Sequence, residues 1–394
     1  MKILSLFDGI SCARVALERA GIPVEAYYAS EVDKYAMQIS AKNYPDIVQL
    51  GDITSLISDE GLSVGISGKG FLENANNIDL LIGGSPCQDL SIAKKDRKGL
   101  DGERSGLFWQ YVNMLKYVKP KYFILENVNS MPKEAKAIIT ETLGVEPIMI
   151  NAALVSAQNR KRLFWVGRLV GDTYEQVIIP QPEDRGILLK DILQAENEID
   201  PKYLVEYDYD TNETYLAKSF RMKEKSNTIR TSGRGSGIDD KHNWDTIRIG
   251  QIGKGGQADR IYSPEGKSVG LSALGCGRGA KTGLYIVEAT KKGYAIAQEG
   301  DSVDLSFPNS KTRRGRVGKK AKNIMTSQNI GVVQNTQIRK LTPTECMRLQ
   351  GLPDGYCDGV SNSQQYKMLG NAFNVDVVAH ILASLEKEIN IKPE

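Results

Sequence analysis

The 394-residue chain has few of the residues that build metal sites and disulfide frameworks. Its only histidines are His242 and His380, which excludes most hydrolase triads and histidine-rich metal sites. Its five cysteines are scattered and include no C-x-x-C pair, which argues against a zinc ribbon and favours reduced thiols inside a cell. No apolar run approaches the ~18 residues of a membrane helix, and the first residues already have the pattern of a strand. We therefore expect a cytoplasmic protein with no membrane span, signal peptide or metal.

Charge is unevenly distributed along the chain, although the net charge is only +3. Residues 185–340 hold 27 Lys and Arg against 18 Asp and Glu, an excess of nine, so the remainder carries a net charge of −6. A basic part joined to an acidic part suggests a module that binds a polyanion. A solvated lysine-rich surface would explain the same excess.

Strand and helix signals alternate over the first 170 residues, which predicts an α/β fold with a doubly wound, Rossmann-like sheet. The expected strands are Lys2–Phe7, Val24–Ser30, Ile78–Ile82, Tyr122–Leu125, Val145–Ala153 and Leu163–Val166. The expected helices are Cys12–Ala20, Lys34–Asn43, Leu107–Val118, Pro132–Leu143, Thr344–Leu349 and Asn374–Lys387. The apolar stripe of the last helix needs a partner, for which the N-terminal sheet is the natural candidate. We therefore expect one domain from residues 1–168 plus 336–394, interrupted by a smaller domain over 169–335.

The interrupting segment has a different character. Residues 233–283 contain 13 glycines, and helical periodicity is lost there. A weak repeat begins at Lys225, Lys267 and Lys322, where lysine, a small polar residue and a short apolar stretch follow one another. This pattern predicts short strand–turn units in a loop-rich β module, although the abundance of Lys, Ser and Gly could produce it by chance.

The turn Phe7-Asp8-Gly9-Ile10-Ser11 follows the first expected strand, where doubly wound sheets bind nucleotide-like cofactors. The pattern G-x-G-x-x-G is absent, which disfavours a pyrophosphate and leaves a mononucleoside. Glu31 ends the second strand, where a carboxylate can hold both ribose hydroxyls. Asp52, after the third apolar segment, could accept a hydrogen bond from an adenine amino group. Each acid alone could equally be a cap or turn former.

Pro86-Cys87 follows a buried strand, at the sheet edge where α/β active sites form. A lone cysteine is more often a core residue, but two preceding glycines and a polar continuation make burial of Cys87 less favoured. The continuation, residues 88–104, has the composition of an active-site lid. Glu126 ends the next expected strand and should lie at the same edge.

The sequence Gln158-Asn159-Arg160-Lys161-Arg162 precedes the last expected strand. In an extended segment Gln158, Arg160 and Arg162 would point the same way, and that face could serve a phosphate and a carbonyl oxygen. Alone, a basic pentapeptide is more often a solvated loop.

Together these motifs resemble the DNA (cytosine-5) methyltransferases that use S-adenosylmethionine, with likeness to the de novo subgroup and the size of a bacterial or phage enzyme. The motifs occur in family order over nearly the whole chain. They are Phe7-Asp8-Gly9, Gly84-Ser85-Pro86-Cys87-Gln88, Glu126-Asn127-Val128, Gln158-x-Arg160-x-Arg162, the structural motif from Arg339 to Gly351, and Gly370-Asn371-Ala372-Phe373-Asn374-Val375. The chain departs from many members at Asp8, Ser11, Ala372 and Phe373, which lie along the expected cofactor edge.

The resemblance implies S-adenosylmethionine as the cofactor, S-adenosylhomocysteine as its product, and a target recognition domain over residues 169–335. It also implies a monomer acting on double-stranded DNA in a bacterial or phage-infected cell, with a cognate restriction endonuclease as a possible partner. The implied cofactor-binding residues are Phe7, Asp8, Gly9, Ile10, Glu31, Val32, Asp52, Ile53, Pro86, Asn371 and Ala372.

The implied chemistry suits the residue types of the motifs. Cytosine C5 is a poor nucleophile, and addition of the Cys87 thiolate to C6 would activate it. Glu126 would protonate N3, and Arg162 would hold O2. Arg160 would bind a phosphate or the lid, and Gln158 would support the pocket. The target base must leave the duplex to reach such a site, and water is expected to take the C5 proton.

Three rival functions make different demands on the sequence. A zinc-dependent nucleobase deaminase needs H-x-E and P-C-x-x-C, which the chain lacks. A tRNA cytosine-5 methyltransferase would carry the same motifs, but the large glycine-rich insert favours duplex DNA. A catalytically inactive DNA-binding protein would have lost Cys87, Glu126 or an arginine, and all are present.

Overall fold

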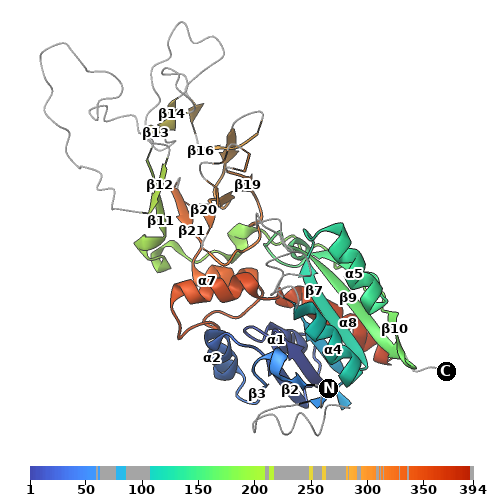
Figure 1. Ribbon diagram of the computed structural model, residues 1–394. Helices are drawn as coiled ribbons and strands as arrows, with labels where there is room; N and C mark the ends of the chain where they lie inside the picture. The colour runs from blue at the N-terminus through green and yellow to red at the C-terminus, as the bar shows by residue number, and fades with distance from the viewer. Residues whose placement is uncertain are drawn as a thin grey trace, which may run out of the picture. The chain divides into compact units, whose positions relative to one another are not determined.

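The structure, a computed structural model, describes residues 1–58, 61–62, 77–85, 107–208, 213–216, 248–251, 260–262, 281–282, 284–290, 294–307, 310, 312–313, 315–327, 329–334 and 337–390. The chain divides into two compact units (Figure 1). Unit 1 comprises Met1–Ile187, Asn323–Ser327 and Cys346–Glu394, and unit 2 comprises Leu188–Lys322 and Gln328–Glu345. Unit 1 thus extends past residue 168, resumes at Cys346 instead of residue 336, and includes a short segment, Asn323–Ser327, that the sequence placed in the interrupting domain.

An eight-stranded sheet forms the centre of unit 1, in the order β10-β9-β7-β6-β1-β2-β3 with β8 paired to β9. Its strands are β1 (Lys2–Leu6), β2 (Ala26–Ser30), β3 (Val48–Gln49), β6 (Leu80–Gly83), β7 (Tyr122–Val128), β8 (Ile148–Asn151), β9 (Lys161–Val170) and β10 (Thr173–Gln176). The pairs from β3 through β7 are parallel, whereas β8, β9 and β10 pair antiparallel. The strands after β1 are added first on one side of it (β2, β3) and then on the other (β6, β7), so the strand order reverses between β1 and β6. Ligands of doubly wound sheets bind beside such a switch point. The predicted α/β fold is confirmed.

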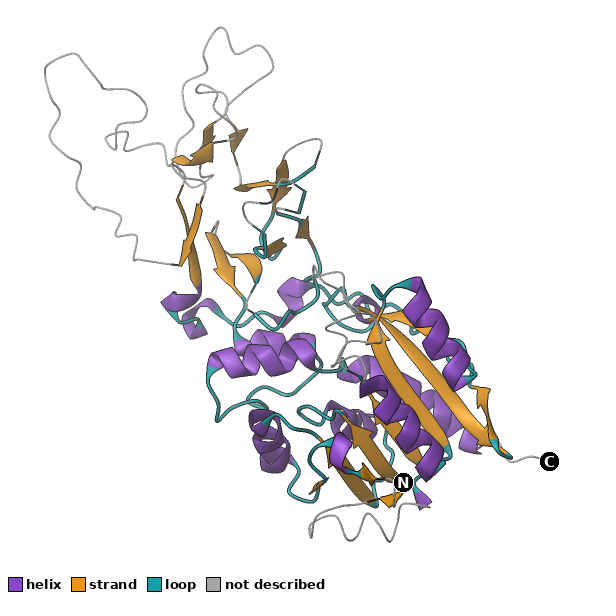
Figure 2. Ribbon diagram, viewed as in Figure 1, coloured by secondary structure: helices purple, strands orange, loops and turns teal. Residues whose placement is uncertain are grey.

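Helices pack against this sheet because its central strands are apolar on both faces (Figure 2). The helices of unit 1 are α1 (Cys12–Arg19), α2 (Lys34–Asn43), α4 (Leu107–Val118), α5 (Lys133–Leu143), α7 (Asn362–Asn371) and α8 (Val375–Asn390). α4 and α5 share one buried core with Leu6, Phe123 and Trp165 of the strands. α1 packs against α8, so the last helix does join the N-terminal fold as its apolar stripe requires.

The helix α7 was not predicted, because its sequence is mostly polar and glycine-containing. It is nonetheless held in place by buried Tyr366, Met368 and Leu369. The stretch Asn362–Glu386, which covers α7 and most of α8, is long and apolar enough to cross a membrane by length and composition alone. Its most apolar window is 72% buried inside the structure, and the two helices are interrupted at Ala372, which fits core helices of unit 1.

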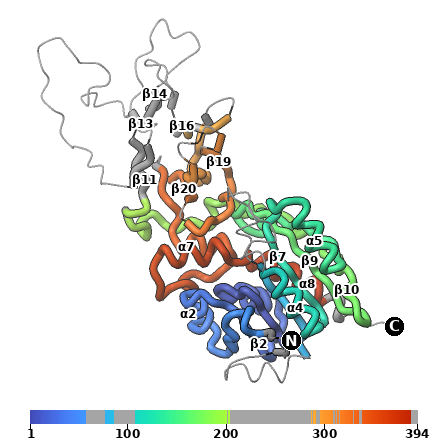
Figure 3. Tube along the Cα trace, viewed as in Figure 1, coloured from blue at the N-terminus to red at the C-terminus, as the bar shows by residue number. Residues whose placement is uncertain are grey.

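Unit 2 is rich in β-strands (Figure 3). An antiparallel six-stranded sheet has the order β12-β11-β21-β20-β18-β19, beside a three-stranded sheet and the hairpin β16-β17. Its strands are β11 (Leu204–Asp208), β12 (Glu213–Leu216), β13 (Arg248–Gln251), β14 (Arg260–Tyr262), β15 (Lys281–Thr282), β16 (Leu284–Val287), β17 (Tyr294–Ala297), β18 (Ser302–Asp304), β19 (Val317–Gly318), β20 (Ile330–Gln334) and β21 (Gln337–Lys340), followed by the helix α6 (Pro343–Leu349) at the boundary.

One sequence prediction about this part is wrong. The third copy of the weak repeat, Lys322–Thr326, forms no strand, and all of it after Lys322 belongs to unit 1. A five-residue apolar pattern carries too little information to separate a strand from an irregular buried segment. The first two copies lie outside the described residues.

Candidate active site

Glu126 lies at the carboxyl edge of the sheet because β7 extends beyond its neighbour β6. The last residue pair between them is Gly83 with Leu125, so Glu126 projects past the end of β6. A Cβ atom on Gly84 would lie 3.0 Å from Glu126 Oε2 and 2.8 Å from the Phe373 ring, so a side chain there would crowd both groups. The edge is therefore tightly built around this carboxylate.

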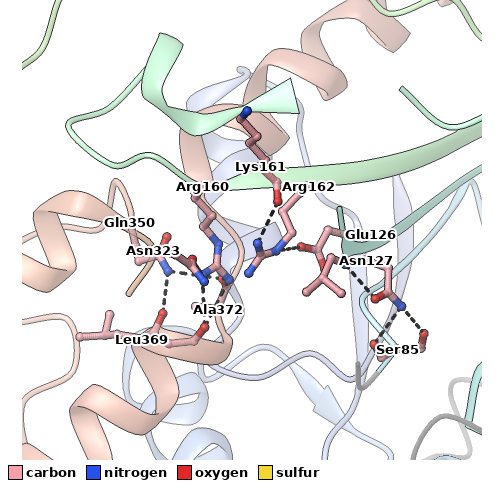
Figure 4. A network of polar contacts seen from close by, with 12 residues as sticks. Ser85, Glu126, Asn127, Arg160, Lys161, Arg162, Asn323, Gln350, Leu369 and Ala372 are labelled. Atoms are coloured by element: carbon pink, nitrogen blue, oxygen red, sulfur yellow. Dashed lines mark hydrogen bonds and ion pairs between the residues drawn. The ribbon is translucent and has the colours of Figure 1, made fainter. Parts of the chain in front are cut away.

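Asn127 fixes the backbone that leads toward the predicted nucleophile. Its amide nitrogen is 3.1 Å from Ser85 Oγ and 3.4 Å from the Ser85 carbonyl oxygen, and all three groups are buried (Figure 4). Pro86 and Cys87 follow directly in the sequence. They and the predicted lid lie outside the described residues, so their roles stay predictions.

Arg162 pairs with Glu126 inside a pocket of unit 1. Its Nε is 2.7 Å from Glu126 Oε1, and each side chain is only 13% exposed (Figure 4). Partial burial strengthens such a charged pair relative to one in water. The pocket holds about 230 Å³ of empty space, part of it open to solvent. Its lining residues are Glu126, Ile150, Ala152, Arg160, Arg162, Phe164, Phe373, Asn374 and Val377.

Arg160 lines the same pocket, but its donors are directed at protein oxygens. The guanidinium group donates to Asn323 Oδ1 at 2.6 Å, to the Ala372 carbonyl at 2.8 Å, and twice to the Gly370 carbonyl at 3.3 Å (Figure 4). Arg160 is 4% exposed. These contacts disfavour the predicted phosphate or lid contact and favour a role in holding the local structure.

Gln158 does not share the face of the two arginines. It is fully buried, it is absent from the pocket lining, and neither amide atom has a hydrogen-bond partner among the described residues. Any support from Gln158 must come from behind the pocket wall.

The predicted cofactor turn has an unusual backbone. Phe7, Gly9 and Ser11 have φ angles of 57°, 61° and 59°, in the left-handed region. Glu31 stabilises the turn by accepting from the Gly9 N–H at 2.7 Å, while its other oxygen accepts from the Val32 and Asp33 N–H groups. A Cβ atom on Gly9 would meet nothing within 4 Å, so the turn faces open space.

Asp8 points away from that space, into a buried polar cluster. Its carboxylate accepts from Tyr27 Oη at 2.7 Å and from Ser11 Oγ at 2.5 Å. Burial raises the pKa of Asp8 to about 6, although the hydrogen bonds from Ser11 and Tyr27 oppose this shift. Asp8 therefore supports the turn from beneath.

The other predicted cofactor residues divide by exposure. Val32 is 68% exposed and offers an apolar surface, whereas Ile10 and Ile53 are buried in the core. Asp52 caps a short 3₁₀ helix by accepting from the Thr54 N–H at 2.9 Å. An open glycine turn, a carboxylate at the end of β2 and an exposed apolar side chain fit a nucleoside without phosphates.

The loop after α7 closes the pocket from the C-terminal part of unit 1. Asn371 ends α7 and is exposed, and the Ala372 carbonyl accepts from both Arg160 and Gln350. Phe373 and Asn374, inside the last motif, line the pocket although sequence reasoning did not select them. Asn323 was also missed as a site residue, because the sequence placed it only in the third copy of the weak repeat.

The model of the family "C-5 cytosine-specific DNA methylase" matches residues 1–387. The chain belongs to this family. The methylase is 26% identical to the type II methyltransferase M.HhaI of Haemophilus parahaemolyticus, over 100% of this chain and 96% of the relative. It is 28% identical to the orphan methyltransferase M.SPRI of Bacillus phage SPR, over 98% and 97% of the two chains.

The fold of the methylase is also found among solved structures. A DNA modification methyltransferase encoded within an Escherichia coli prophage superposes with a TM-score of 0.54 at 20% identity, covering 99% of each chain. At that identity the likeness shows the fold alone. The family match and the curated relatives together make the protein a C-5 cytosine-specific DNA methyltransferase.

Proposed function

We propose that the methylase transfers a methyl group from S-adenosylmethionine to C5 of a cytosine flipped out of duplex DNA, through a covalent bond between Cys87 and C6. The observation that supports this most strongly is the Glu126–Arg162 pair in the pocket at the carboxyl edge of the sheet. The chain continues from that edge through Ser85 to Pro86 and Cys87.

In this proposal Cys87, Glu126 and Arg162 each have a distinct role in the reaction. The Cys87 thiolate adds to C6, and Glu126 gives a proton to N3 as negative charge develops on the ring. Arg162 keeps Glu126 in place and directs its remaining donors at the cytosine O2. After methyl transfer, water takes the C5 proton, N3 returns its proton, and the Cys87 thiolate leaves C6.

The cofactor supplies an electrophilic methyl group on sulfonium when it is bound. In the proposal, the open turn at Gly9 and the exposed Val32 accommodate its nucleoside, and Glu31 and Asp52 have acceptor oxygens to share with the ribose and the adenine. Phe7 and Asn371 lie on the predicted cofactor edge. Asp8 acts indirectly, by supporting the turn from beneath, and Ile10 follows the turn into the buried core.

We propose unit 2 as the target recognition unit, with double-stranded DNA as the substrate. Its β-rich structure and the basic excess of the segment that contains it support this assignment. One of the two relatives is named a type II methyltransferase and the other an orphan methyltransferase, and neither name mentions an endonuclease. A cognate endonuclease, a monomeric state and a cytoplasmic location therefore stay predictions.

Transfer of tritium from labelled S-adenosylmethionine tests the proposal directly. We expect incorporation into duplex DNA and none into tRNA, and bisulfite sequencing of DNA from cells expressing the chain should place 5-methylcytosine in one short sequence context. Incorporation into tRNA alone would favour the rival tRNA methyltransferase.

A further inference from the structure

The Arg160 guanidinium group joins parts of unit 1 that are far apart in the sequence. Its Nη1 is 2.6 Å from Asn323 Oδ1, and its Nη2 is 2.8 Å from the Ala372 carbonyl oxygen. Asn323 and Ala372 lie 163 and 212 residues away along the chain. Because Arg160 stands two positions before Arg162, this junction lies next to the Glu126–Arg162 pair (Figure 4).

A second set of contacts holds the segment Asn323–Ser327 against α7. A Cβ atom on Gly370 would lie 2.6 Å from the carbonyl carbon and oxygen of Met325, and 2.7 Å from the Thr326 nitrogen. These are backbone atoms that cannot move aside, so only glycine permits the approach. Ile324 is 3% exposed, which shows that the segment is built into the core of unit 1.

The same five residues interrupt unit 2. Lys322 on one side and Gln328 on the other belong to unit 2. Lys322 Nζ pairs with Asp304 Oδ2 of β18 at 2.8 Å, and Ile330 begins β20, the strand paired with β18. The polypeptide therefore leaves the unit 2 sheet, passes through the segment that Arg160 binds, and returns to the same sheet.

We propose that Arg160 and Asn323 are positioning residues that couple the recognition function of unit 2 to the target-base pocket of unit 1. This rests on the proposed recognition role of unit 2. Recognition of the correct sequence by unit 2 is transmitted through Asn323 to Arg160, and from there to Arg162 and Glu126. The fork of the guanidinium is required, because it bridges the segment and the loop after α7 at once.

Substitution of Asn323 tests the coupling. Asn323→Ala removes the acceptor, and we expect kcat on cognate duplex to fall about tenfold to a hundredfold, the range of one lost charged hydrogen bond. The KM for S-adenosylmethionine should stay within about twofold, and the preference for cognate over non-cognate duplex should shrink. Asn323→Asp keeps the oxygen and should restore kcat and preference, and the unchanged KM for S-adenosylmethionine in Asn323→Ala distinguishes lost positioning from a loss of fold.

Arg160→Lys separates positioning from phosphate binding without relying on the Asn323 variants. A lysine still binds a phosphate as a point charge but cannot bridge Asn323 and Ala372. We expect kcat to drop while the slope of log DNA affinity against log salt is unchanged. Full activity in Arg160→Lys, or in Asn323→Ala, would overturn the inference. Failure of the wild type itself to methylate duplex DNA selectively would instead overturn the proposed function.

Discussion

At the scale of single residues, the nucleophile is the sharpest prediction. We expect Cys87 to form a stable adduct with duplex DNA containing 5-fluorocytosine when S-adenosylmethionine is present, because fluorine cannot leave C5 as a proton does. Denaturing electrophoresis would detect the adduct as a shifted band. Cys87→Ser should lose the band and nearly all turnover, whereas Cys357→Ser, at a buried thiol elsewhere in unit 1, should keep the band. Turnover of Cys87→Ser near the wild-type rate would contradict the assignment.

Glu126 should act on the base and not on the cofactor. In the wild type, Arg162 Nε is 2.7 Å from Glu126 Oε1. Glu126→Gln keeps an oxygen that can accept this hydrogen bond but removes the acid needed at N3. We expect kcat to fall about 10²- to 10⁴-fold, the usual contribution of a general acid, with S-adenosylmethionine affinity within about twofold. Calorimetric titration with the cofactor checks the second part. Lost cofactor binding with surviving turnover would move Glu126 to the cofactor site.

The buried carboxyl of Asp8 should make stability depend on pH. Burial raises its folded pKa to about 6, above the ordinary 3.8, so between these values the folded state binds more protons than the unfolded state. The protonated form therefore contributes stability that is lost as pH rises through that window. The contribution of Asp8 to the free energy of unfolding should fall by about 3 kcal/mol, at 1.36 kcal/mol per pKa unit.

The Asp8→Asn variant isolates this effect. We expect the unfolding free energy of the wild type to fall relative to that of Asp8→Asn as the pH rises from about 4 to about 7. Urea denaturation of both proteins at each pH measures this difference. Asp172→Asn, at a carboxylate that is 91% exposed, controls for the loss of one acid. A difference that stays constant with pH would show that Asp8 does not titrate in this range.

At the scale of secondary structure, the apolar runs of the central strands predicted most of unit 1, because strands buried on both faces need apolar residues throughout. The end of β7 was placed too early, since Glu126 and Asn127 end the apolar run while pairing with β9 continues. That longer strand is also what carries Glu126 past β6. Polar helix α7 could not be predicted from periodicity.

The active-site residues follow the same division. Glu126 and Arg162 were predictable from motif and strand edge, and the structure brings them together. The environment of Arg160 was not predictable, because its partners are distant in the sequence and one of them, Asn323, lies in a weak repeat that carries no family motif. Burial of Asp8 was equally hidden, since a turn in the sequence does not tell which way a side chain points.

A buried ion pair joins Arg339, which precedes α6, to Glu345 in the first turn of α6, and it should be a main stabilising element of unit 2. Arg339 and Glu345 are 3% and 0% exposed and are joined by hydrogen bonds of 2.8 and 2.6 Å, and Glu345 also accepts from the Thr342 and Gln194 N–H groups. Removing one partner leaves a buried charge unpaired.

We expect Glu345→Gln to lower the free energy of unfolding by about 3–5 kcal/mol, as measured by chemical denaturation. Arg348 and Asp354 form a matched control with the same sequence spacing, at 2.6 Å but 30% and 51% exposed. Asp354→Asn should cost less than about 1 kcal/mol. Similar losses in both variants would show that burial does not govern the contribution of these pairs.

At the scale of the whole molecule, the charge asymmetry acquires a structural meaning. The basic segment Lys311–Lys322 holds seven positive charges and no acid. Within it, Lys319 and Lys322 pair with Asp301 and Asp304 of unit 2, and Arg316 donates to the Ala289 and Thr312 carbonyls. Much of the charge thus stabilises unit 2 itself, which sequence counting could not distinguish from charge offered to DNA.

Arg313 is the member of this segment best placed to meet a phosphate. It is exposed, and its guanidinium carbon lies 5.2 Å from the centre of the Phe307 ring, within the range of a cation–π contact. We expect Arg313→Ala to weaken binding of specific and random duplexes alike, and to reduce the slope of log affinity against log salt by about 0.9. Replacing Arg313, Arg314 and Arg316 together should reduce the slope further if Arg314 also meets the backbone.

The control must remove the same charge from a surface that DNA does not approach. Lys116 is exposed in the last turn of α4, which leads to the start of β7, so it lies at the sheet edge opposite the candidate active site. Fluorescence anisotropy at several salt concentrations should give Lys116→Ala the wild-type slope. If Arg313→Ala matches it, the segment is a solvated surface. If Arg313 reads a base edge instead, the slope should persist while sequence preference relaxes by about 1–3 kcal/mol, because bidentate base contacts discriminate among sequences and phosphate contacts do not.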